Sequence, residues 1–299
     1  MKTFSLRKRP MLLAATAALA LGLSACGGTG GGTSPSGADE APYKVADNVS
    51  ITGSPTFDTI KSSGKVRIGV KQDQPGLGFK DAATGEYSGF DIEIAQWIAA
   101  SLGLAKDKIE FKPIPSANRE SAITNGDIDY YVGTYSITDK RKQLIDFAGP
   151  YFVTGQGLLV KKDNSTIKTE KDLSGKNVCS ATGSTPIQNI KANFPDTKTT
   201  EFDTYSQCVE ALKSGQVDAV TTDQAILLGY AAQEPDNLKV VGEPFTTEKY
   251  GVGLKKGDTA LRQFINKTLT DGGSVWQKIY DKTLGQSGTK VQQPAVDNY

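Results

Sequence analysis

The sequence predicts an α/β fold with largely parallel sheets, because short apolar strands alternate with helical segments along most of the chain. A weak internal repeat supports this prediction, since a helix, a glycine and an aspartate-bearing strand occur twice, at an offset of 89 (215 minus 126). The repeated positions are Ala122-Ile123, Gly126 and Asp129, then Ala211-Leu212, Gly215 and Asp218. We therefore expect two related lobes whose post-strand loops surround one cleft, where ligands of open α/β sheets bind.

Alternating or continuous apolar runs predict the strands, which we expect at 65–70, 108–114, 128–132, 157–160, 176–180, 199–202, 217–220, 238–241 and 251–254. Helical spacing and capping residues predict helices at 91–102, 116–125, from 139, from 186, 206–214, 223–230, 258–269 and 275–284. A Pro/Gly loop is expected at 72–78. Gly183-Ser184-Thr185-Pro186 supplies an N-cap and a proline at the first helical position, and Gly215 follows a helix end.

Composition narrows the classes of function. The 299 residues suffice for one large or two medium domains, and the net charge of +1 gives no reason to expect a nucleic-acid partner. The chain has no histidine, which removes the usual general base and the commonest metal ligand. Neither a metal nor a cofactor is expected, and three cysteines are too few for a disulfide-rich scaffold.

The N-terminus has the pattern of an export signal. Four basic residues precede an apolar run at 11–23 that is too short to span a bilayer comfortably, and Leu23-Ser24-Ala25-Cys26 resembles a bacterial lipobox. We expect 1–25 to be a lipoprotein signal peptide, Cys26 to carry a lipid, and 26–50 to be a flexible tether. The alternative is an ordinary secretory signal. Either way the protein is exported, and the lipid would hold it at the outer face of the cell membrane.

With Cys26 lipidated, Cys179 and Cys208 remain as an even pair outside the cytosol, and we predict a disulfide between them. Two buried free thiols are the alternative. In neither case are these cysteines catalytic.

The segment 126–151 holds the strongest candidate for ligand binding. After the strand at 128–132 comes a loop, and Thr138 is a good N-cap for a helix in which Arg141 is the third residue. A capping box would place Glu or Gln there, and a cation opposes the helix dipole. The loop amides, the helix N-terminus and the guanidinium would together favour an anion. A solvated surface arginine is the alternative.

Four short motifs then resemble the polar-amino-acid-binding proteins of ABC importers. They are Gly89-Phe90-Asp91-Ile92, Asn125-Gly126-Asp127-Ile128-Asp129, Ser136-Ile137-Thr138-Asp139-Lys140-Arg141 and Asp146-Phe147-Ala148-Gly149-Pro150-Tyr151. The resemblance covers about 60–285 and is greatest to the lipid-anchored glutamate-binding components of actinobacterial uptake systems. It implies a two-lobe periplasmic-binding-protein-like fold with two hinge strands. The implied parts are lobe 1 at 51–153 and 247–285, lobe 2 at 154–246, and a loose C-terminal tail at 286–299.

The resemblance also implies a ligand site, residue by residue. Arg141 would hold the ligand α-carboxylate with help near Ser136 and Thr185, while Asp223 and Thr134 would hold the α-ammonium. A zwitterion taken out of water needs both an anion holder and a cation holder, and dividing them between lobes makes binding favour closure. For Asp223, a plain helix N-cap is the alternative.

By the same resemblance, Lys71 and Arg119 are expected to face the ligand side chain. Two bases there argue for a ligand carboxylate, that of glutamate or aspartate, and the resemblance to the glutamate-binding branch places glutamate first and aspartate second. Each could instead be a surface charge. Tyr135 and Ser184 are further possible contacts.

The expected function is therefore capture of an acidic amino acid by a monomer and its delivery to an ABC permease and its ATPase subunit. The alternatives are binding of another polar amino acid such as glutamine, a secreted amino-acid-processing enzyme on the same fold, or the sensor domain of a receptor.

Overall fold

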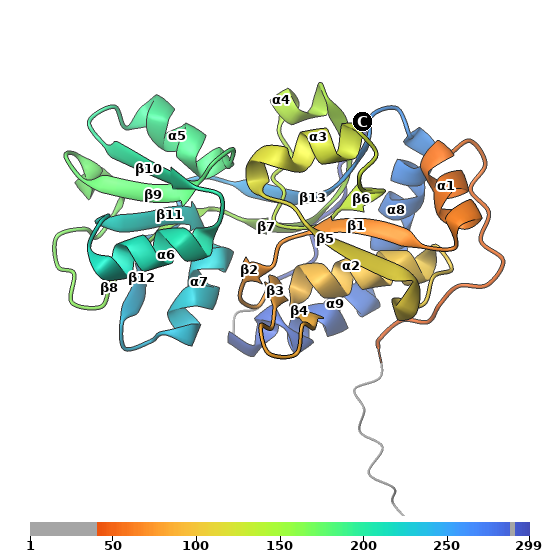
Figure 1. The fold of residues 1–299 in the computed structure, drawn as a ribbon, viewed down its shortest axis with the longest axis horizontal. Helices are drawn as coiled ribbons and strands as arrows, with labels where there is room; N and C mark the ends of the chain where they lie inside the picture. Colours follow the sequence, from red (N-terminus) through yellow and green to blue (C-terminus); the bar gives the residue numbers. More distant parts are fainter. Residues whose placement is uncertain (1–40, 288–290) are drawn as a thin grey trace, which may run out of the picture. The chain divides into compact units, whose positions relative to one another are not determined.

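The computed structural model describes residues 41–287 and 291–299, which form two α/β lobes (Figure 1). The predicted signal peptide, the lipidated Cys26 and most of the predicted tether fall within residues 1–40 and lie outside the described residues. Among the helices that are described, none combines the length and the apolarity that crossing a bilayer would require.

Lobe 1 is built around a five-stranded sheet in the order β5-β1-β6-β13-β7. Its strands are β1 (Val66–Val70), β5 (Ile109–Pro113), β6 (Tyr130–Tyr131), β7 (Ile145–Thr154) and β13 (Glu248–Lys255). β1 runs parallel to β5 and β6, whereas β13 runs antiparallel to β6 and β7. The carboxyl ends of β1 and β6 therefore lie at one edge, and Lys71 and the loop at 132–138 follow them there.

Lobe 2 has a sheet of the same size in the order β10-β9-β11-β8-β12. Its strands are β8 (Gln156–Lys161), β9 (Asn177–Ala181), β10 (Lys198–Phe202), β11 (Ala219–Asp223) and β12 (Leu238–Val241). β9 runs parallel to β10 and β11, and β8 runs antiparallel to β11 and β12. Each sheet thus has two parallel and two antiparallel pairs. The expectation of largely parallel sheets is wrong in this respect, because β8 and β13, which follow the two crossings between the lobes, pair antiparallel.

Helices cover both sheets. In lobe 1 they are α1 (Pro55–Ser63), α2 (Phe90–Ser101), α3 (Arg119–Thr124), α4 (Asp139–Lys142), α8 (Thr259–Asp271) and α9 (Gly273–Lys282). In lobe 2 they are α5 (Thr185–Asn193), α6 (Tyr205–Ser214) and α7 (Gln224–Gln233). Short 3-10 turns lie at η1 (Lys106–Lys108), η2 (Ser116–Asn118), η3 (Glu170–Leu173) and η4 (Leu284–Ser287).

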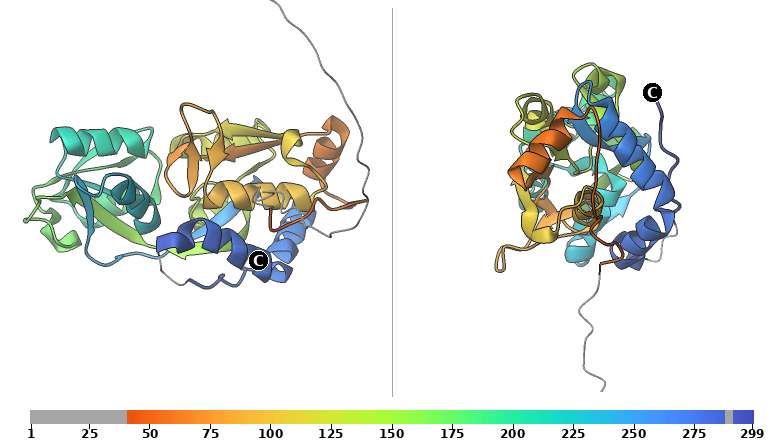
Figure 2. Two further views of the ribbon diagram at one scale, coloured as in Figure 1. Left: turned by 90° about the horizontal axis from the view of Figure 1, so that it is seen from below. Right: turned by 90° about the vertical axis from the view of Figure 1, so that its right-hand side faces the viewer.

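An aromatic cluster fills the core of lobe 1 beneath α2 and α9, which lie on the same side of the lobe (Figure 2). The Phe90 ring meets the edge of Trp276 with 5.8 Å between centroids, and Trp276 stacks on Tyr280 at 5.3 Å. Pairs of this kind add roughly 0.5–1.5 kcal/mol beyond the burial of their area. The core thereby fixes the sheet edge from which the site residues emerge.

A small three-stranded sheet, β2 (Asp73–Gln74), β3 (Gly78–Lys80) and β4 (Tyr87–Ser88), follows β1. The sequence predicted only a loop at 72–78. Gly89 joins this sheet to α2 at a φ of 112°, and a Cβ there would lie 2.2 Å from the Leu77 carbonyl oxygen. Only glycine fits this close approach.

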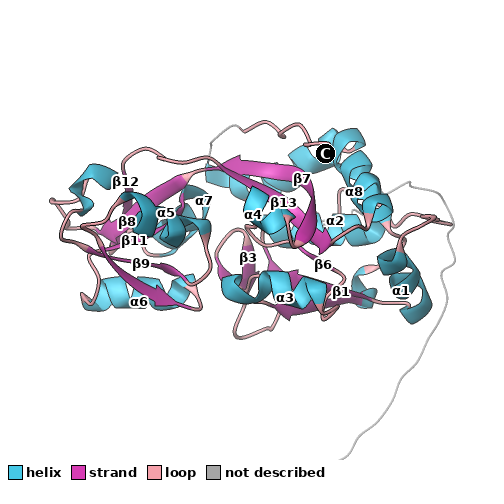
Figure 3. Cartoon of the chain, turned by 90° about the horizontal axis from the view of Figure 1, so that it is seen from above, coloured by secondary structure: helices cyan, strands magenta, loops and turns pink. Residues whose placement is uncertain are grey.

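Two segments cross between the lobes side by side (Figure 3). The chain passes from β7 through Gly155 into β8, and it returns before β13. The Gln156 amide donates to Thr246 Oγ1 at 3.0 Å, and a Cβ on Gly155 would lie 2.2 Å from the Thr246 carbonyl oxygen. The two crossings are therefore packed directly against each other.

The described part of the predicted tether, residues 41–50, is not free of the lobe. The Ala46 amide donates to the Ala100 carbonyl at 2.8 Å, and Tyr43 Oη donates to side chains of α2 at 3.3 Å. The tether prediction is wrong for these residues, because Tyr43 and Val49 pack against the apolar core.

The predicted loose tail also differs from what residues 291–299 show. The Asp297 amide donates to the Gly149 carbonyl at 2.8 Å, which places the tail along β7, an edge strand of its sheet. Tyr299 Oη accepts a 2.7 Å hydrogen bond from the Phe147 amide. Edge strands expose unpaired backbone groups, and this segment covers part of that edge.

Candidate functional site

Arg141 lies where the sequence places it, as the third residue of α4, with Thr138 as N-cap. Each of its three guanidinium nitrogens has a partner: Nη1 donates to the Ser136 carbonyl at 2.7 Å, Nη2 to the Gly183 carbonyl at 3.1 Å, and Nε to Glu120 at 3.2 Å. Three of its five N–H groups are engaged, so Nη1 and Nη2 each keep a hydrogen for an anion. Burial and the neighbouring Arg119 lower the pKa of Arg141.

The Tyr135 ring holds two arginines of lobe 1, Arg119 and Arg141, in place. It is fully buried, and its centroid lies 4.1 Å from the Arg119 guanidinium carbon and 4.9 Å from that of Arg141. Phe147 of β7 packs on it edge-on at 4.9 Å. Cation–π contacts to desolvated guanidinium groups are worth up to about 2 kcal/mol. Tyr135 thus fixes the spacing of the two positive charges.

Lys71 and Arg119 are buried and lie in the same region. Lys71 Nζ donates to Ser116 Oγ at 2.7 Å, and Arg119 donates to the Ser116 and Thr134 carbonyls. Among the described residues, neither cation has a carboxylate within ion-pair distance. Burial and Arg119 lower the pKa of Lys71 to about 7. Two buried cations that have no ion-pair partner among the described residues favour an anion beside them.

Asp223 ends β11 and precedes α7, but its side chain makes no capping hydrogen bond. Oδ2 accepts a 2.7 Å bond from Tyr250 Oη, whereas the buried Oδ1 has no partner among the described residues. Burial and Glu248 raise the pKa of Asp223 to about 7, while the Tyr250 bond, Arg119 and Arg141 act the other way. The neighbouring Thr222 hydroxyl is likewise buried and unpartnered.

Thr185, Ser136 and Ser184 lie where the lobes meet. Thr185 Oγ1 donates to Ser136 Oγ at 3.3 Å and to Glu248 Oε2 at 2.9 Å, so it joins lobe 2 to lobe 1. Ser184 is the N-cap of α5, and Pro186 is therefore the second helical residue, one later than predicted. The Ser184 hydroxyl lies 3.2 Å from Ser180 Oγ, which gives it a local structural role.

Thr134 has an unusual backbone conformation, with a φ of 46° that few non-glycine residues adopt. Its amide donates to Asp91 Oδ2 at 2.9 Å, its carbonyl accepts from Arg119, and its hydroxyl pairs with Gln74. Each of its polar groups is therefore already engaged within lobe 1.

The structure thus brings Arg119 and Arg141 of lobe 1 close enough to Asp223 of lobe 2 to lower its pKa, and the same two arginines lower the pKa of Lys71. Glu248 and Tyr250, both on β13, were missed by the sequence prediction. The only signal for them was a charged and an aromatic residue in Thr-Glu-Lys-Tyr-Gly, just before a predicted strand. Glu120, which accepts from Arg141, was missed as well.

Cys179 on β9 and Cys208 on α6 form the predicted disulfide, which confirms that pairing. Both residues are fully buried. The bond ties a strand of lobe 2 to its covering helix.

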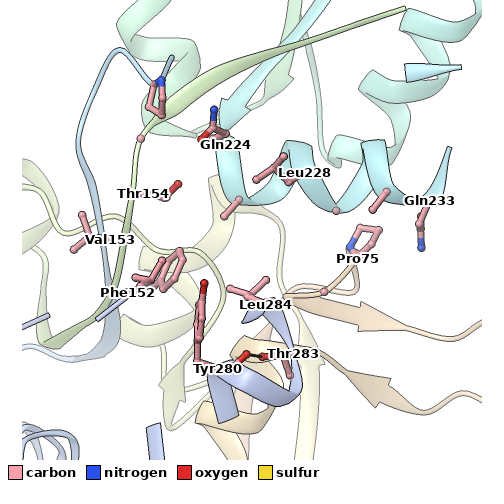
Figure 4. Close-up of a pocket in the computed structure, with 17 residues that line it drawn as sticks. Pro75, Phe152, Val153, Thr154, Gln224, Leu228, Gln233, Tyr280, Thr283 and Leu284 are labelled. Atoms are coloured by element: carbon pink, nitrogen blue, oxygen red, sulfur yellow. Dashed lines mark hydrogen bonds between the residues drawn. The ribbon is translucent and has the colours of Figure 1, made fainter. Parts of the chain in front are cut away.

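A separate apolar cavity of about 810 Å³ lies beside the crossing segment (Figure 4). Its walls come from β7, α7, α9 and η4, including Phe152, Leu228 and Leu284, and Pro75 adds a further contact. None of the described residues that line it is charged. A zwitterion would find no counter-charge there, so the charged cluster is the better candidate site.

Comparison with known proteins gives the chain a family. Residues 66–286 match the bacterial extracellular solute-binding proteins, family 3. The glutamate-binding protein GluB of Corynebacterium efficiens is 43% identical over 245 residues, which cover 77% of this chain and 82% of that protein. The glutamine-binding protein GlnH of an ABC transporter in Bacillus subtilis is 43% identical over 234 residues, covering 77% and 84%.

Among solved structures, an ancestral arginine-binding protein bound to glutamine has a TM-score of 0.70 and 41% identity, covering 74% of this chain and 98% of that one. This similarity confirms the periplasmic-binding-protein-like two-lobe fold. The relatives are binding proteins and not enzymes, which also confirms the expectation that this protein is not an enzyme. The chain belongs to family 3 of the bacterial extracellular solute-binding proteins, and it is an amino-acid solute-binding protein of the kind that works with ABC transporters.

Proposed function

We propose that this protein captures an acidic amino acid, glutamate first and aspartate second, by closing its two lobes around it. It would then deliver the ligand to an ABC permease and its ATPase subunit. The lipid on Cys26 would keep the protein at the outer face of the membrane, where the permease is. A relative that carries the name of a glutamate-binding protein supports this substrate class.

The observation that carries the proposal is the pair of opposite charges held by different lobes. Arg141 keeps two N–H groups free for a carboxylate, and Asp223 keeps a buried oxygen free for an ammonium group. A free amino acid has both groups on one carbon atom. Because one lobe supplies each partner, the closed arrangement gains both interactions at once.

In this proposal the ligand α-carboxylate binds Arg141, with Ser136 and Thr185 beside it. The ammonium group binds Asp223, with Thr134 as a second contact. Tyr135 and Ser184 line the site, and Tyr135 acts mainly by orienting the arginines. We add Glu248 to the residues around the ligand ammonium group, because Glu248 lies close enough to Asp223 to raise the pKa of Asp223.

The acidic side chain of the ligand would bind Lys71 and Arg119. Both cations are buried without a carboxylate partner in the described residues, and a ligand carboxylate would supply the missing charge. Glutamate reaches further than aspartate by one methylene group, which is worth about 1–3 kcal/mol in a fitted pocket.

Glutamine is the second candidate, and a specific observation favours it. Lys71 has a pKa of about 7 and could bind a neutral amide as a hydrogen-bonding amine. A relative of equal identity carries the name of a glutamine-binding protein.

The hinge of this motion would lie at residues 154–155 and 246–247, which border the proposed lobe boundaries. Gly155 and Thr246 are in direct contact there, at the ends of β7 and β13.

Isothermal titration calorimetry with glutamate, aspartate, glutamine and arginine tests the proposal. The expected order is glutamate, then aspartate, with glutamine at least tenfold weaker. Tighter binding of glutamine than of glutamate would contradict the acidic substrate while leaving amino-acid binding in place.

A further inference from the structure

The small sheet after β1 brings one carboxylate of lobe 1 into contact with lobe 2. Asp73, on β2, has an Oδ2 that accepts hydrogen bonds from the Tyr205 amide at 2.9 Å and the Ser206 amide at 3.1 Å. These are the first two residues of α6. The contact involves none of the groups that the proposed function assigns to the ligand, although the negative charge of Asp73 also acts on Lys71 and raises its pKa.

The geometry of α6 explains why a carboxylate fits there. The first amides of a helix have no acceptor within the helix, and the positive end of the helix dipole lies beside them. Thr204 is the N-cap, and the helix amide that its hydroxyl accepts from is that of the third helical residue, Gln207. The first two amides therefore need an outside acceptor, and Asp73 of the other lobe supplies it.

A second helix of lobe 2 holds the same residue. Tyr230 of α7 is buried, and its hydroxyl donates to the Asp73 carbonyl oxygen and lies 3.4 Å from Oδ2. The adjacent Pro75 packs on α7 so closely that a Cβ on Gly229 would lie 2.2 Å from the Pro75 carbonyl oxygen. The turn at 73–75 is thus seated between α6 and α7.

We propose that Asp73 is a positioning residue that keeps the lobes closed and so slows release of the ligand. This inference rests on the proposed binding of an amino acid by lobe closure. When the lobes separate, the helix amides and Asp73 return to water, which costs two charge-assisted hydrogen bonds. Asp73 acts through the lobe arrangement, so it lengthens the stay of glutamate and glutamine alike.

The test compares four forms of the full chain: the wild type, Asp73→Asn, Tyr230→Phe and Asp203→Asn. Asp203 is the matched control, because it is exposed near the same helix end, and its side chain has no hydrogen bond among the described residues. Stopped-flow fluorescence gives the association and dissociation rates for glutamate and glutamine. Thermal unfolding without ligand reports on folding itself.

Asp73→Asn should speed dissociation of both amino acids about tenfold, with association rates within about twofold of the wild type. Its ligand-free melting temperature should stay unchanged while both amino acids dissociate faster, a pattern that a merely structural role would not give. Tyr230→Phe should speed dissociation by a smaller factor, and it still tests the inference if Asp73→Asn does not fold.

A wild-type dissociation rate in both Asp73→Asn and Tyr230→Phe would overturn the inference, as would an equal effect of Asp203→Asn. If the wild type binds glutamine and not glutamate, the proposed substrate fails, but the same comparison made with glutamine still decides the role of Asp73. If the wild type binds no amino acid, both proposals fail.

Discussion

Tyr250 donates a 2.7 Å hydrogen bond to Oδ2 of Asp223, while Oδ1 of the same carboxylate remains buried without a partner among the described residues. Tyr250 belongs to β13, which follows the return crossing. A group of lobe 1 therefore orients the lobe 2 carboxylate that we propose binds the ammonium group of the ligand. An unpaired buried carboxylate oxygen costs folding free energy, and proteins keep such a cost mainly at functional sites.

Replacing Asp223 should therefore change the stability of the fold and the affinity for the ligand in opposite directions. The pKa of Asp223 is raised from 3.8 to about 7, so the unfolded chain loses this proton first, and the free energy of unfolding falls as pH rises from about 4 to about 7. Asp223→Asn removes the buried charge. At pH 8 it should raise the ligand-free unfolding free energy by about 1–3 kcal/mol while weakening glutamate binding at least 100-fold.

Urea denaturation at pH 5 and pH 8, together with calorimetry, would measure both effects. Asp196→Asn, at an exposed aspartate of lobe 2, is the control and should change neither quantity. Near-normal affinity in Asp223→Asn would remove this residue from the site.

Arg141→Ala should cost about 3 kcal/mol or more of binding free energy, because the ligand α-carboxylate would be buried without a partner. Calorimetry at constant pH measures this loss directly. Lys140→Ala removes an exposed cation from the same helix turn and should leave the affinity within about twofold. An equal loss in the two variants would indicate a general electrostatic effect and not a contact.

The double variant Lys71→Met/Arg119→Met should distinguish the ligand side chain from the ligand backbone. Methionine keeps the length and removes the charge, so glutamate affinity should fall at least tenfold more than glutamine affinity. Competition binding with both ligands gives this ratio. Lys112→Met, at a half-buried lysine of β5 that pairs with Glu110, serves as control, and equal losses for the two amino acids would count against the assigned pocket.

Local rules predicted most of the elements that carry the site. Thr138 and Ser184 are N-caps because their hydroxyl groups accept hydrogen bonds from helix amides. Gly215 ends α6 in a left-handed conformation because it has no Cβ. Arg141 and Asp223 could be placed because both come after predicted strands, whose positions follow from the alternation of strands and helices along the chain. The disulfide followed from the even pair of cysteines.

The missed features depend on contacts distant in sequence. β7 contains Asp146 and Pro150, residues that strands usually avoid, and it forms because β13 pairs along it. Asp146 is accommodated at the edge by Lys256 and the Gly257 amide. Tyr299 likewise contacts the Phe147 backbone and the cationic ends of Lys142 and Arg262, partners that no local pattern reveals.

Removing the disulfide should lower the free energy of unfolding by about 3–4 kcal/mol on the chain-entropy model, since the cysteines are 29 residues apart. Cys179→Ala/Cys208→Ala, compared with the wild type in guanidinium denaturation, measures this change. Reducing agent should lower the free energy of unfolding of the wild type and leave that of the variant unchanged. A wild-type midpoint in the variant would mean that the bond contributes little.

A crystal structure with L-glutamate bound tests the central claim most directly. The account predicts the α-carboxylate on Arg141, the ammonium group on Oδ1 of Asp223, and the side-chain carboxylate between Lys71 and Arg119. Glutamate bound elsewhere, with Arg141 and Asp223 both out of hydrogen-bonding distance of it, would contradict the account.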